Sequence, residues 1–542
     1  MRLSILASLA VLASLSVVVL LAADSSRAKV ACPLPTEALG GECVLRDDVT
    51  LSDTMPLPSG TQLNCRGYQI TPVGAGSADD PRTAANEFQP SHPDLALFVH
   101  RSYNVKIQNC VISGFDFGII VAQSKSEDAP AGAGPLSNKI LGNTIDVRTN
   151  PIDVINSDNV LITDNWLRYA AERGRGVVVD YDSDGNQIRH NTIISTDAAS
   201  TGQVRQLPGG PFVASTAIMD IEIHCLQSDK PLQNFVVGGV LYQVASGDLL
   251  SDFEDSGRSD HNLIEANDII DLGAGPSCTF DPGTSCRADA DCVGKGTCLL
   301  KQNSGIGFNL RAANNTVRGN QVSGRMDRGI SFGGVSAAMT LPNWFPGTCA
   351  LDPNRLCSGN SDCNIQGHDT ASLGSCMGVG AATFNGNSLR LLAEDNVLSG
   401  TYDTAALFAT NTDQFVFRRN TANGGASGVR INPAAINGTI EHNVVSGFSN
   451  ALYLVFQPSF TNAIRLNDFT QYSVAIRTSN DFTTMTDVSA DAGNYWGLPC
   501  PGFDPARVLF DNGAANPNVF DGKPYGRPVA TTSGARVPKG CR

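Results

Sequence analysis

A short pattern recurs through most of this chain and limits what it can fold into. The pattern is Φ-x-x-N-x-Φ, where Φ is mostly apolar, and it appears as ILGNTI, ITDNWL, IRHNTI, IEANDI, VRGNQV, FRRNTA, IEHNVV and IRLNDF, with AEDNVL as a weaker copy. The asparagines are Asn143, Asn165, Asn191, Asn267, Asn320, Asn396, Asn420, Asn443 and Asn467, with Cys110 in the same place of IQNCVI. Spacings of 22, 26, 24, 23 and 24 residues indicate one repeating unit.

The second half of each unit predicts strands. Segments such as GIIV, GVVVDYD, GIGFNL, GISF, GVRI, ALYLV and VAIRT are short and alternate with period two, and no helix-length 3.6-residue period appears. A unit of about two dozen residues with three short strands cannot bury its apolar face alone. Stacked coils can, because each strand then pairs with its counterpart about 4.8 Å away.

The repeated asparagine has two expected roles in such a stack. It tolerates the left-handed backbone of a tight turn. Its amide can also donate to one neighbouring coil and accept from the other, and an unpaired buried amide costs roughly 1–3 kcal/mol. Cys110 fits at the end of this ladder because a small apolar residue needs no partner.

Three spacings are too long for one unit. Two cysteine clusters account for those of 53 and 76 residues that follow Asn267 and Asn320. The stretch from Ser195 to Asn267 must hold an extra coil or a long loop.

The cysteine clusters predict disulfide-stapled loops, inserted at 276–302 and 342–378. They contain Cys278, Cys286, Cys292 and Cys298, and then Cys349, Cys357, Cys363 and Cys376, with the shared spacing C-x7-C-x5-C. Zinc is the rival interpretation, but zinc sites favour C-x2-C pairs, which are absent. We expect bonds within each cluster, Cys32 with Cys43, and Cys500 with Cys541, which leaves Cys65, Cys110 and Cys225.

The N-terminus resembles a targeting segment. Arg2 precedes an apolar run from Leu3 to Leu21, and small residues follow, which predicts a signal peptide over 1–28 cleaved between Ala22 and Ala28. An uncleaved membrane anchor is the alternative, because the run is long for a signal. With 15 cysteines, the mature chain is expected to be secreted, periplasmic or extracellular, without a membrane partner after cleavage.

Composition excludes one class of partner. The formal net charge is −14 and the pI about 4.9, so the chain lacks the basic surface of a general nucleic-acid binder. The 54 glycines and 17% charged residues suit tight turns and short strands.

Units such as LFVHRSYNVKIQNCVISGFDFGIIV and GVVVDYDSDGNQIRHNTIIS, with the late GNYWG, resemble right-handed parallel β-helix proteins of the pectin-lyase-like superfamily. The branch they resemble includes secreted carbohydrate-binding and sugar-hydrolase proteins and periplasmic copper-enzyme maturation proteins. The resemblance implies an all-β right-handed parallel β-helix of about 10–13 coils over 29–497, followed by a tail at 498–542. No catalytic signature of the pectin-active or alginate-active members is present in full.

Two acidic segments are candidate sites. In VVVDYDSDGN, Asp180, Asp182 and Asp184 alternate as in the first half of an EF-hand loop, which makes Ca²⁺ a candidate ligand, although SDGN is also ordinary turn chemistry. In IMDIEIHC, a regular strand projects Asp220, Glu222 and His224 from one face. Such a set can serve acid–base chemistry or hold a metal, and a solvated strand face is the plain alternative.

The same alternation predicts one outward stripe along the stacked strands. It contains Asp153, Asp180 and Asp182 toward the N-terminal half, and Arg311, Arg430, Tyr453 and Arg477 toward the C-terminal half. Acidic groups beside Arg and Tyr suit a polymer with hydroxyl and carboxylate groups. Two functions follow: a polysaccharide lyase, hydrolase or epimerase with Asp180, Asp182, Asp220, Glu222, His224 and Arg311 as catalytic candidates, or a non-catalytic β-helix that binds glycan or builds surface structure.

Overall fold

The structure is a computed structural model, and it describes most of the chain between residues 32 and 530. The described residues are 32–33, 36–73, 95–126, 128–129, 137–169, 175–180, 182–196, 218–224, 232–237, 240–245, 259–272, 277–278, 281–285, 293–294, 298–299, 303–309, 312–333, 338–345, 347–357, 359–365, 372–385, 387–455, 460–482, 484–489, 491–499 and 502–530. The expected signal peptide at 1–28 lies outside them, as do Cys225, Cys286, Cys292, Cys500 and Cys541.

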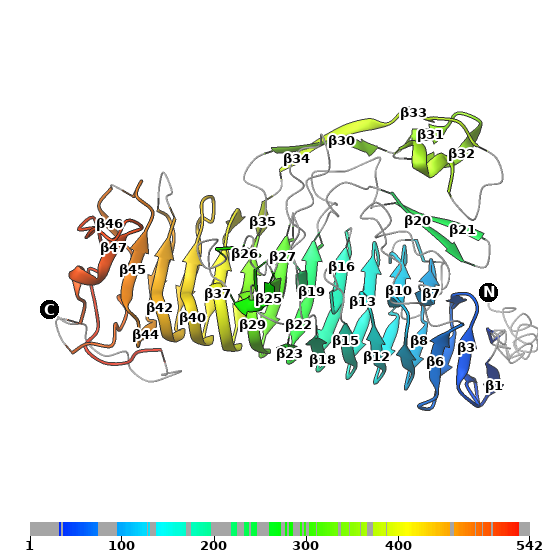
Figure 1. The fold of residues 1–542 in the computed structure, drawn as a ribbon, viewed down its shortest axis with the longest axis horizontal. Coiled ribbons are helices and arrows are strands. Elements are labelled where there is room, and N and C mark those ends of the chain that lie inside the picture. Colours follow the sequence, from blue (N-terminus) through cyan, green and yellow to red (C-terminus); the bar gives the residue numbers. More distant parts are fainter. Residues whose placement is uncertain are drawn as a thin grey trace, which may run out of the picture.

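The described chain is a right-handed parallel β-helix (Figure 1). The first of its sheets has 13 strands, and all of them after β1 pair in parallel, which gives twelve coils and agrees with the expected range. Its strands are β1 (Glu37–Leu39), β2 (Glu42–Val44), β5 (Gln62–Asn64), β8 (Lys106–Gln108), β11 (Lys139–Leu141), β14 (Leu161–Thr163), β17 (Gln187–Arg189), β22 (Leu263–Glu265), β28 (Thr316–Arg318), β36 (Leu392–Glu394), β39 (Val416–Arg418), β41 (Thr439–Glu441) and β43 (Ala463–Arg465).

The second and third sheets merge in four coils where one strand runs through both. The second contains β3 (Val49–Leu51), β6 (Gln69–Pro72), β9 (Val111–Ser113), β12 (Thr144–Val147), β15 (Trp166–Tyr169), β18 (Thr192–Ser195), β23 (Asp268–Asp271) and β44 (Asp468–Thr470). The third contains β4 (Met55–Pro56), β7 (Leu95–His100), β10 (Phe117–Ala122), β13 (Asn150–Ile155), β16 (Val177–Asp180), β19 (Ile218–His224), β27 (Asn303–Asn309), β45 (Val474–Thr478) and β47 (Val508–Phe510). The shared strands are β29 (Gln321–Phe332), β37 (Val397–Ala409), β40 (Thr421–Ile431) and β42 (Val444–Leu454).

Small elements decorate this solenoid. The 3-10 helices η2 (Asn360–Cys363) and η3 (Pro505–Arg507) are present, and no α-helix occurs among the described residues. Short strand pairs are β20 (Leu232–Val237) with β21 (Val240–Ala245), β30 (Ala338–Phe345) with β34 (Gly380–Asn385), β35 (Ser388–Leu389) with β38 (Thr412–Asp413), and β46 (Thr486–Asp487) with β48 (Val519–Phe520). Two three-stranded sheets contain β24 (Ser277–Cys278), β25 (Asp281–Ser285) and β26 (Cys298–Leu299), and then β31 (Gly347–Cys349), β32 (Asp352–Cys357) and β33 (Cys376–Met377).

One hydrophobic core runs the length of the helix. From β5 onward, the middle residue of each first-sheet strand points into it, as Ile140, Ile162 and Ile188 do in consecutive coils, each at most 1% exposed. Burying such a side chain contributes roughly 1.5–3 kcal/mol, so the repeated apolar positions hold the coils together.

The asparagine ladder is confirmed. From Asn143 to Asn467, each ladder residue donates from its backbone N–H and its Nδ2 to the Oδ1 of the next, at 2.8–3.1 Å. Each of these side chains is at most 2% exposed, so no water replaces a lost partner. The ladder continues through Asn494 and ends on Asp521, two positions that the repeat pattern did not include.

The left-handed backbone lies one residue earlier than predicted. The positive φ belongs to the residue before each ladder asparagine, for example His190 (φ 51°), Arg419 (φ 53°) and His442 (φ 56°). The turn therefore accepts several residue types at its strained position. Asparagine recurs in the following position because of its amide.

The expectation that Cys110 needs no partner is wrong. Its sulfur bonds to Cys65, while its backbone N–H donates to Asn143 Oδ1 at 2.9 Å. The ladder thus begins beside a disulfide. Cys110 has no side-chain amide, so it takes part in the ladder through its backbone N–H.

The described residues between Ser195 and Asn267 form no extra coil. Strand β17 pairs with β22 and β18 pairs with β23, so these coils are direct neighbours, and β19 supplies the third-sheet strand of the first of them. The β20–β21 hairpin also lies in this stretch.

The described disulfides agree with the predicted pairing. Cys349 bonds Cys363 and Cys357 bonds Cys376, both within the second cluster, and Cys32 bonds Cys43. Zinc is therefore excluded at the second cluster. Together with Cys65–Cys110, these bonds place the folded chain in an oxidising compartment outside the cytosol.

Candidate functional site

One row of residues follows the third sheet from coil to coil. We call it the outer row, and it contains, in register, Phe98, Ile120, Asp153, Val178, Glu222, Gly307, Ser331, Phe408, Arg430, Tyr453 and Arg477. It alternates with rows that fill the core, such as Val121, Val154 and Val179. The predicted stripe members Asp153, Arg430, Tyr453 and Arg477 therefore share one line along the helix.

The C-terminal half of the outer row combines aromatic rings with guanidinium groups. Arg430 Cζ lies 4.6 Å from the centre of the Tyr453 ring, and Arg328 Cζ lies 4.1 Å from that of Phe408. Tyr453 donates its hydroxyl proton to Asp511 Oδ2, and Arg477 Nε donates to Oδ1 of the same carboxylate, both at 3.0 Å.

These contacts fix the planes of half-buried side chains. Burial, and then the hydrogen bond to Asp511, raise the pKa of the Tyr453 hydroxyl. Burial lowers the pKa of the Arg430 guanidinium, and the nearby charge of Arg328 adds to this effect. Fixed Arg and Tyr side chains that remain partly exposed suit ligands with hydroxyl and carboxylate groups.

The N-terminal end of the outer row, at Phe98 and Ile120, is covered. Phe98 and Ile120 form a separate buried cluster with Val237 of the β20–β21 hairpin, and the Tyr242 ring packs edge-on against Phe98 at 5.3 Å. The next hairpin residue, Gln243, accepts from the N–H of Leu356 and donates to its carbonyl, at 3.0 and 2.8 Å. The hairpin is thereby joined to the disulfide-rich elements above the helix (Figure 1).

His100 lies in the same aromatic contact. Its ring stacks on Phe98 at 5.6 Å and meets Tyr242 edge-on at 5.0 Å. Burial lowers the pKa of His100, although its hydrogen bond with Gln123 opposes this. His100 therefore makes a packing contact at the covered end of the outer row.

Asp182 and Asp184 lie in the turn after β16, outside the outer row. Lys125 Nζ contacts Asp158 Oδ1 at 2.9 Å, Asp182 Oδ2 at 3.2 Å and the Asp182 carbonyl at 2.7 Å. The side chains of Lys125, Asp158 and Asp182 are 8%, 7% and 12% exposed. The lysine ammonium thus neutralises the carboxylate that we assigned to Ca²⁺, and Ca²⁺ is not supported here.

Asp184 belongs to a stack of backbone-capping carboxylates. Its N–H donates to Asp158 Oδ1 at 3.0 Å, and its own Oδ1 accepts from the N–H of Asp260 at 2.7 Å. Burial, with repulsion from Asp182 and Asp158, raises the pKa of Asp184 to about 7, although Lys125 and the Asp260 N–H act in the opposite direction.

Sequence reasoning missed Lys125 and this stack. Its signal was a repeated Ser-Asp pair, at 157–158, 183–184 and 259–260, once per coil. The serines form their own ladder, in which Ser124, Ser157 and Ser183 each donate a backbone N–H to the next serine hydroxyl.

The remaining catalytic candidates are placed by register. Asp180 pairs with His224, and Val178 pairs with Glu222, so β16 and β19 bring these positions into adjacent coils. Asp220 lies in the same strand, β19. Arg311 lies outside the described residues.

An alternating charge row on the first sheet was also missed. Successive coils place, in register, Arg189, Glu265, Arg318, Glu394, Arg418, Glu441 and Arg465. Ion pairs such as Arg418–Glu394 at 2.7 Å and Arg465–Glu441 at 3.0 Å link them. The signal was the charged residue two positions before each ladder asparagine from Asn191 onward, and opposite charges on facing strands stabilise a sheet.

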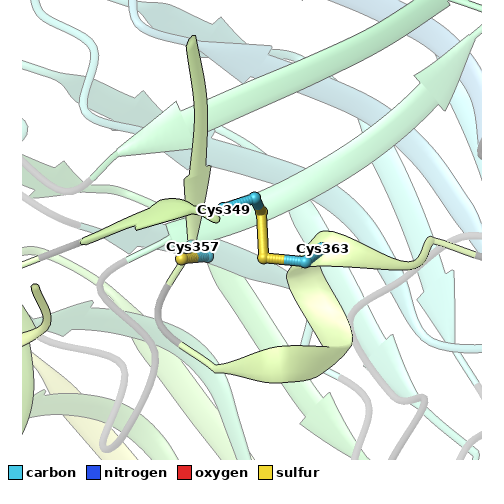
Figure 2. A group of neighbouring side chains, drawn as sticks. All are labelled: Cys349, Cys357 and Cys363. Atoms are coloured by element: carbon cyan, nitrogen blue, oxygen red, sulfur yellow. A yellow bond between two sulfur atoms is a disulfide. The ribbon is translucent and has the colours of Figure 1, made fainter. Parts of the chain in front are cut away.

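Within the described part of the chain, one group of cysteines has metal-like spacing. Cys349, Cys357 and Cys363 bring their sulfurs within 4.8 Å of one another (Figure 2). Each sulfur is already in a disulfide, so none is a thiolate able to ligate metal.

Comparison with known proteins supports the class of protein and leaves its activity open. The chain is a right-handed parallel β-helix protein, and residues 62–202 match the family model described as NosD, periplasmic copper-binding protein. No curated protein matches. Among the described residues, no helix is long and apolar enough to cross a membrane.

Two solved structures are similar at low score. PfbA, a surface adhesin of Streptococcus pneumoniae, has 10% identity and a TM-score of 0.35, over 81% of this chain and 84% of the adhesin. The tailspike protein of E. coli bacteriophage HK620, solved with a pentasaccharide, has 10% identity and a TM-score of 0.30, over 86% and 67% of the two chains.

Proposed function

We propose that this protein binds an acidic polysaccharide along the C-terminal half of the outer row. The observation that carries the proposal is the consecutive placement of Arg430, Tyr453 and Arg477 on three paired strands. Rungs of a parallel sheet repeat about every 4.8 Å, so a polymer lying along the helix axis meets one such side chain per rung. Guanidinium groups bind carboxylates, and a tyrosine ring offers an apolar face with a polar edge to a sugar.

A binding role fits this half better than catalysis. Asp511 is held by both Tyr453 and Arg477. Two further carboxylates of this half are paired with arginines, Asp327 with Arg328 at 3.1 Å and Asp403 with Arg325 at 3.6 Å. A hydrolase or lyase needs an acid and a base poised beside the reacting bond. Carboxylates engaged with arginines and tyrosine suit a binding surface better.

A second candidate is a polysaccharide-cleaving or epimerising enzyme centred on β16 and β19. The pairing of Asp180 with His224, two positions from the pairing of Val178 with Glu222, favours it. A carboxylate beside a histidine can act in acid–base chemistry. This candidate site lies in the N-terminal half of the outer row, at Val178 and Glu222.

Copper binding, which the family description names, does not enter the proposal. The matched segment is residues 62–202. The described cysteine group lies outside that segment, and its sulfurs are all in disulfides. The cysteines of this group therefore do not fit a copper site.

The proposal is tested by calorimetric titration of the native protein with oligogalacturonate and with its carboxyl-reduced counterpart. We expect binding of the acidic oligomer alone, weakened by added salt because screening acts on exposed charges. Equal affinity for the two oligomers would contradict recognition of the carboxylates. Absence of binding to both would reject the proposed function for this ligand class.

A further inference from the structure

The described side chains of the outer row differ in exposure along its length. From β7 to β37 they are at most 7% exposed, although they face away from the core: Phe98, Ile120, Asp153, Val178, Ser331 and Phe408. From β40 onward they are half-buried: Arg430, Tyr453, Arg477 and Leu509. In the part of the row that the structure describes, a ligand can therefore reach only the last four strands of the third sheet.

Phe408 marks the boundary between the two stretches. The Arg328 guanidinium covers its ring, with Cζ 4.1 Å from the ring centre, and Arg328 Nε lies 3.1 Å from Asp327 Oδ2. The Phe408 ring is buried, and so is Ser331, which pairs with Phe408 from the preceding strand. A polymer that follows the row from Arg430 toward the N-terminal end thus meets a closed surface after one rung.

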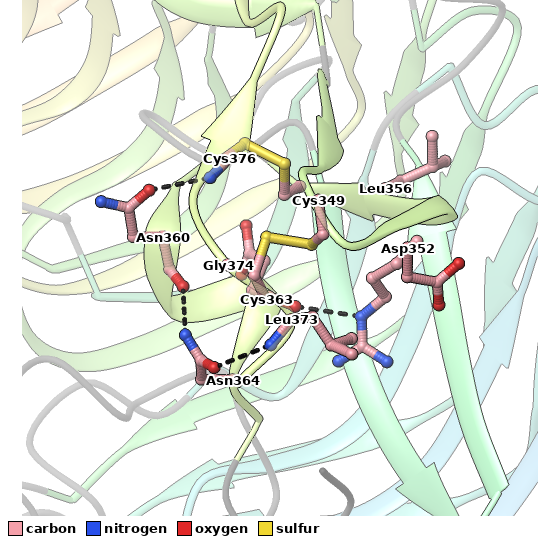
Figure 3. Close-up of a disulfide and its surroundings, with 12 residues drawn as sticks. Cys349, Asp352, Leu356, Asn360, Cys363, Asn364, Leu373, Gly374 and Cys376 are labelled. Carbon is pink, nitrogen blue, oxygen red and sulfur yellow. Dashed lines mark hydrogen bonds between the residues drawn. A yellow bond between two sulfur atoms is a disulfide. The ribbon is translucent and has the colours of Figure 1, made fainter. Parts of the chain in front are cut away.

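The β20–β21 hairpin, which covers the far end of the row, is braced from above. Its Gln243 side chain bonds to the backbone of Leu356 in β32. Figure 3 shows Leu356 beside the sheet and the 3-10 helix that two disulfides join, Cys349–Cys363 and Cys357–Cys376. Because these bonds hold β31, β32, β33 and η2 together, a covalently closed unit supports the cover.

The exposed stretch also ends on its C-terminal side. Leu509 of β47 forms an antiparallel bridge with Ala515, and the Phe510 N–H donates to the Ala514 carbonyl at 2.8 Å. The chain thus turns back along the edge of β47, where the parallel stack of described strands stops. From Arg430 to Leu509 there are three rung spacings, which together measure about 14 Å.

Within this stretch, Arg430 is the guanidinium available to an anion. Arg477 is already paired with Asp511 at 3.0 Å. Arg430 donates from Nε to Asn432 Oδ1 at 2.9 Å and lies over the Tyr453 ring, and it forms no ion pair with any described carboxylate. Burial lowers the pKa of Arg430, so its charged form is one that a ligand carboxylate would stabilise.

We infer, on the basis of the proposed function, that the outer row recognises a short segment of acidic glycan, about three to four sugar residues long, with one carboxylate at Arg430. A sugar residue of an extended chain is about as long as one rung, so the exposed stretch holds this many. The rest of a longer chain leaves the surface at Phe408 and makes no further contact. The protein therefore binds a chain locally and does not follow it along the helix.

The test is calorimetric titration of the native protein with oligogalacturonates from the dimer to the octamer. We expect affinity to rise up to about the tetramer and then to stay within about twofold, after correction for the number of registers in which a longer chain can bind. An octamer that binds more than about tenfold more tightly than the tetramer would overturn the inference and leave acidic-glycan binding intact. Absence of binding at every length would reject the proposed function, and the inference with it.

A second measurement compares tetramer and octamer in Arg430→Met. One carboxylate at one guanidinium predicts the same loss of affinity, about tenfold, for both lengths. A smaller loss for the octamer would show that other carboxylates bind elsewhere along the row, and would contradict the inference. Arg430→Lys keeps the charge and allows the same comparison, with a smaller loss, if the methionine variant does not fold. Arg418→Met, on the first sheet, is the matched control and should change neither affinity.

Discussion

Asn494 donates to one carboxylate oxygen of Asp521 from both its backbone N–H and its side-chain amide, at 2.8 and 3.0 Å. Trp496 Nε1 donates to the same Oδ2 at 2.9 Å. Asp521 thus presents an acceptor where the amide oxygen of another ladder asparagine would lie. The ladder ends on this carboxylate, which is 5% exposed.

Removing this acceptor should destabilise the C-terminal coils. Asp521→Ala leaves four donors without their oxygen, the three on Oδ2 and the Lys523 N–H on Oδ1, and we expect a loss of at least about 2 kcal/mol in the free energy of unfolding. Asp521→Asn keeps an amide oxygen in place and should lose less than half as much. Chemical denaturation of the two variants measures both effects, and equal losses would show that the acceptor is not what matters.

The middle of the ladder gives a second prediction. Asn443 accepts from Asn420 and donates to Asn467 and to the Phe417 carbonyl, all at 2.9–3.0 Å. Asn443→Ala should therefore lower the free energy of unfolding by at least about 1 kcal/mol. Asn423→Ala, on an exposed position of the adjoining coil, is the matched control and should change it little. Similar losses in both variants would argue against the ladder as the cause.

The repeat predicted the solenoid because its spacing reports directly on stacking. An asparagine every 22 to 26 residues, followed by an alternating strand, leaves few other folds. The end of the ladder was not predictable in this way, because Asp521 lies outside any Φ-x-x-N-x-Φ pattern. The prediction that asparagine itself adopts the left-handed backbone was wrong, because the positive φ belongs to the preceding residue, such as His442.

The buried turn around Lys125 predicts a pH-dependent stability. Burial raises the pKa of Asp184 to about 7, above its ordinary value, so the folded protein binds this proton more tightly than the unfolded chain does. The contribution to stability is complete below about pH 4 and is lost as the pH rises through about 7. Asp184→Asn should therefore melt at a higher temperature than the wild type at pH 8, and at a similar temperature at pH 4.

Thermal melts across this pH range check the effect. Asp164→Asn is the control, since Asp164 is exposed in the turn between β14 and β15. It should leave the pH dependence unchanged. A wild-type melting temperature that is flat from pH 4 to pH 8 would contradict the role of Asp184.

The acidic strand β19 separates the two functional candidates. Glu222→Gln should leave oligogalacturonate affinity within about twofold of the wild type, because residues that are distant and share no partner act independently. It should leave the melting temperature nearly unchanged, as should Asp220→Asn. If these variants abolish both oligogalacturonate binding and the release of cleavage products, the functional site lies at β16 and β19. The enzymatic function is then the better candidate.

The candidate site was only partly predictable from the sequence. Alternation within each strand gave Arg430, Tyr453 and Arg477 a common face, because register in a parallel stack follows the repeat. It did not predict that the Phe98 end would be covered, since the hairpin that covers it comes from more than a hundred residues away. Nor did it predict that Lys125 would neutralise Asp182, since that contact joins turns of different coils.

The most direct test of the account is to remove one guanidinium from the outer row and one from the first sheet. Arg430→Met keeps an apolar stem against Tyr453 and should weaken oligogalacturonate binding about tenfold or more, because a charge-assisted contact is lost. Arg418→Met, in the alternating charge row of the first sheet, should leave that affinity unchanged. Equal weakening in both variants, or an effect of Arg418→Met alone, would contradict an acidic-glycan site on the outer row.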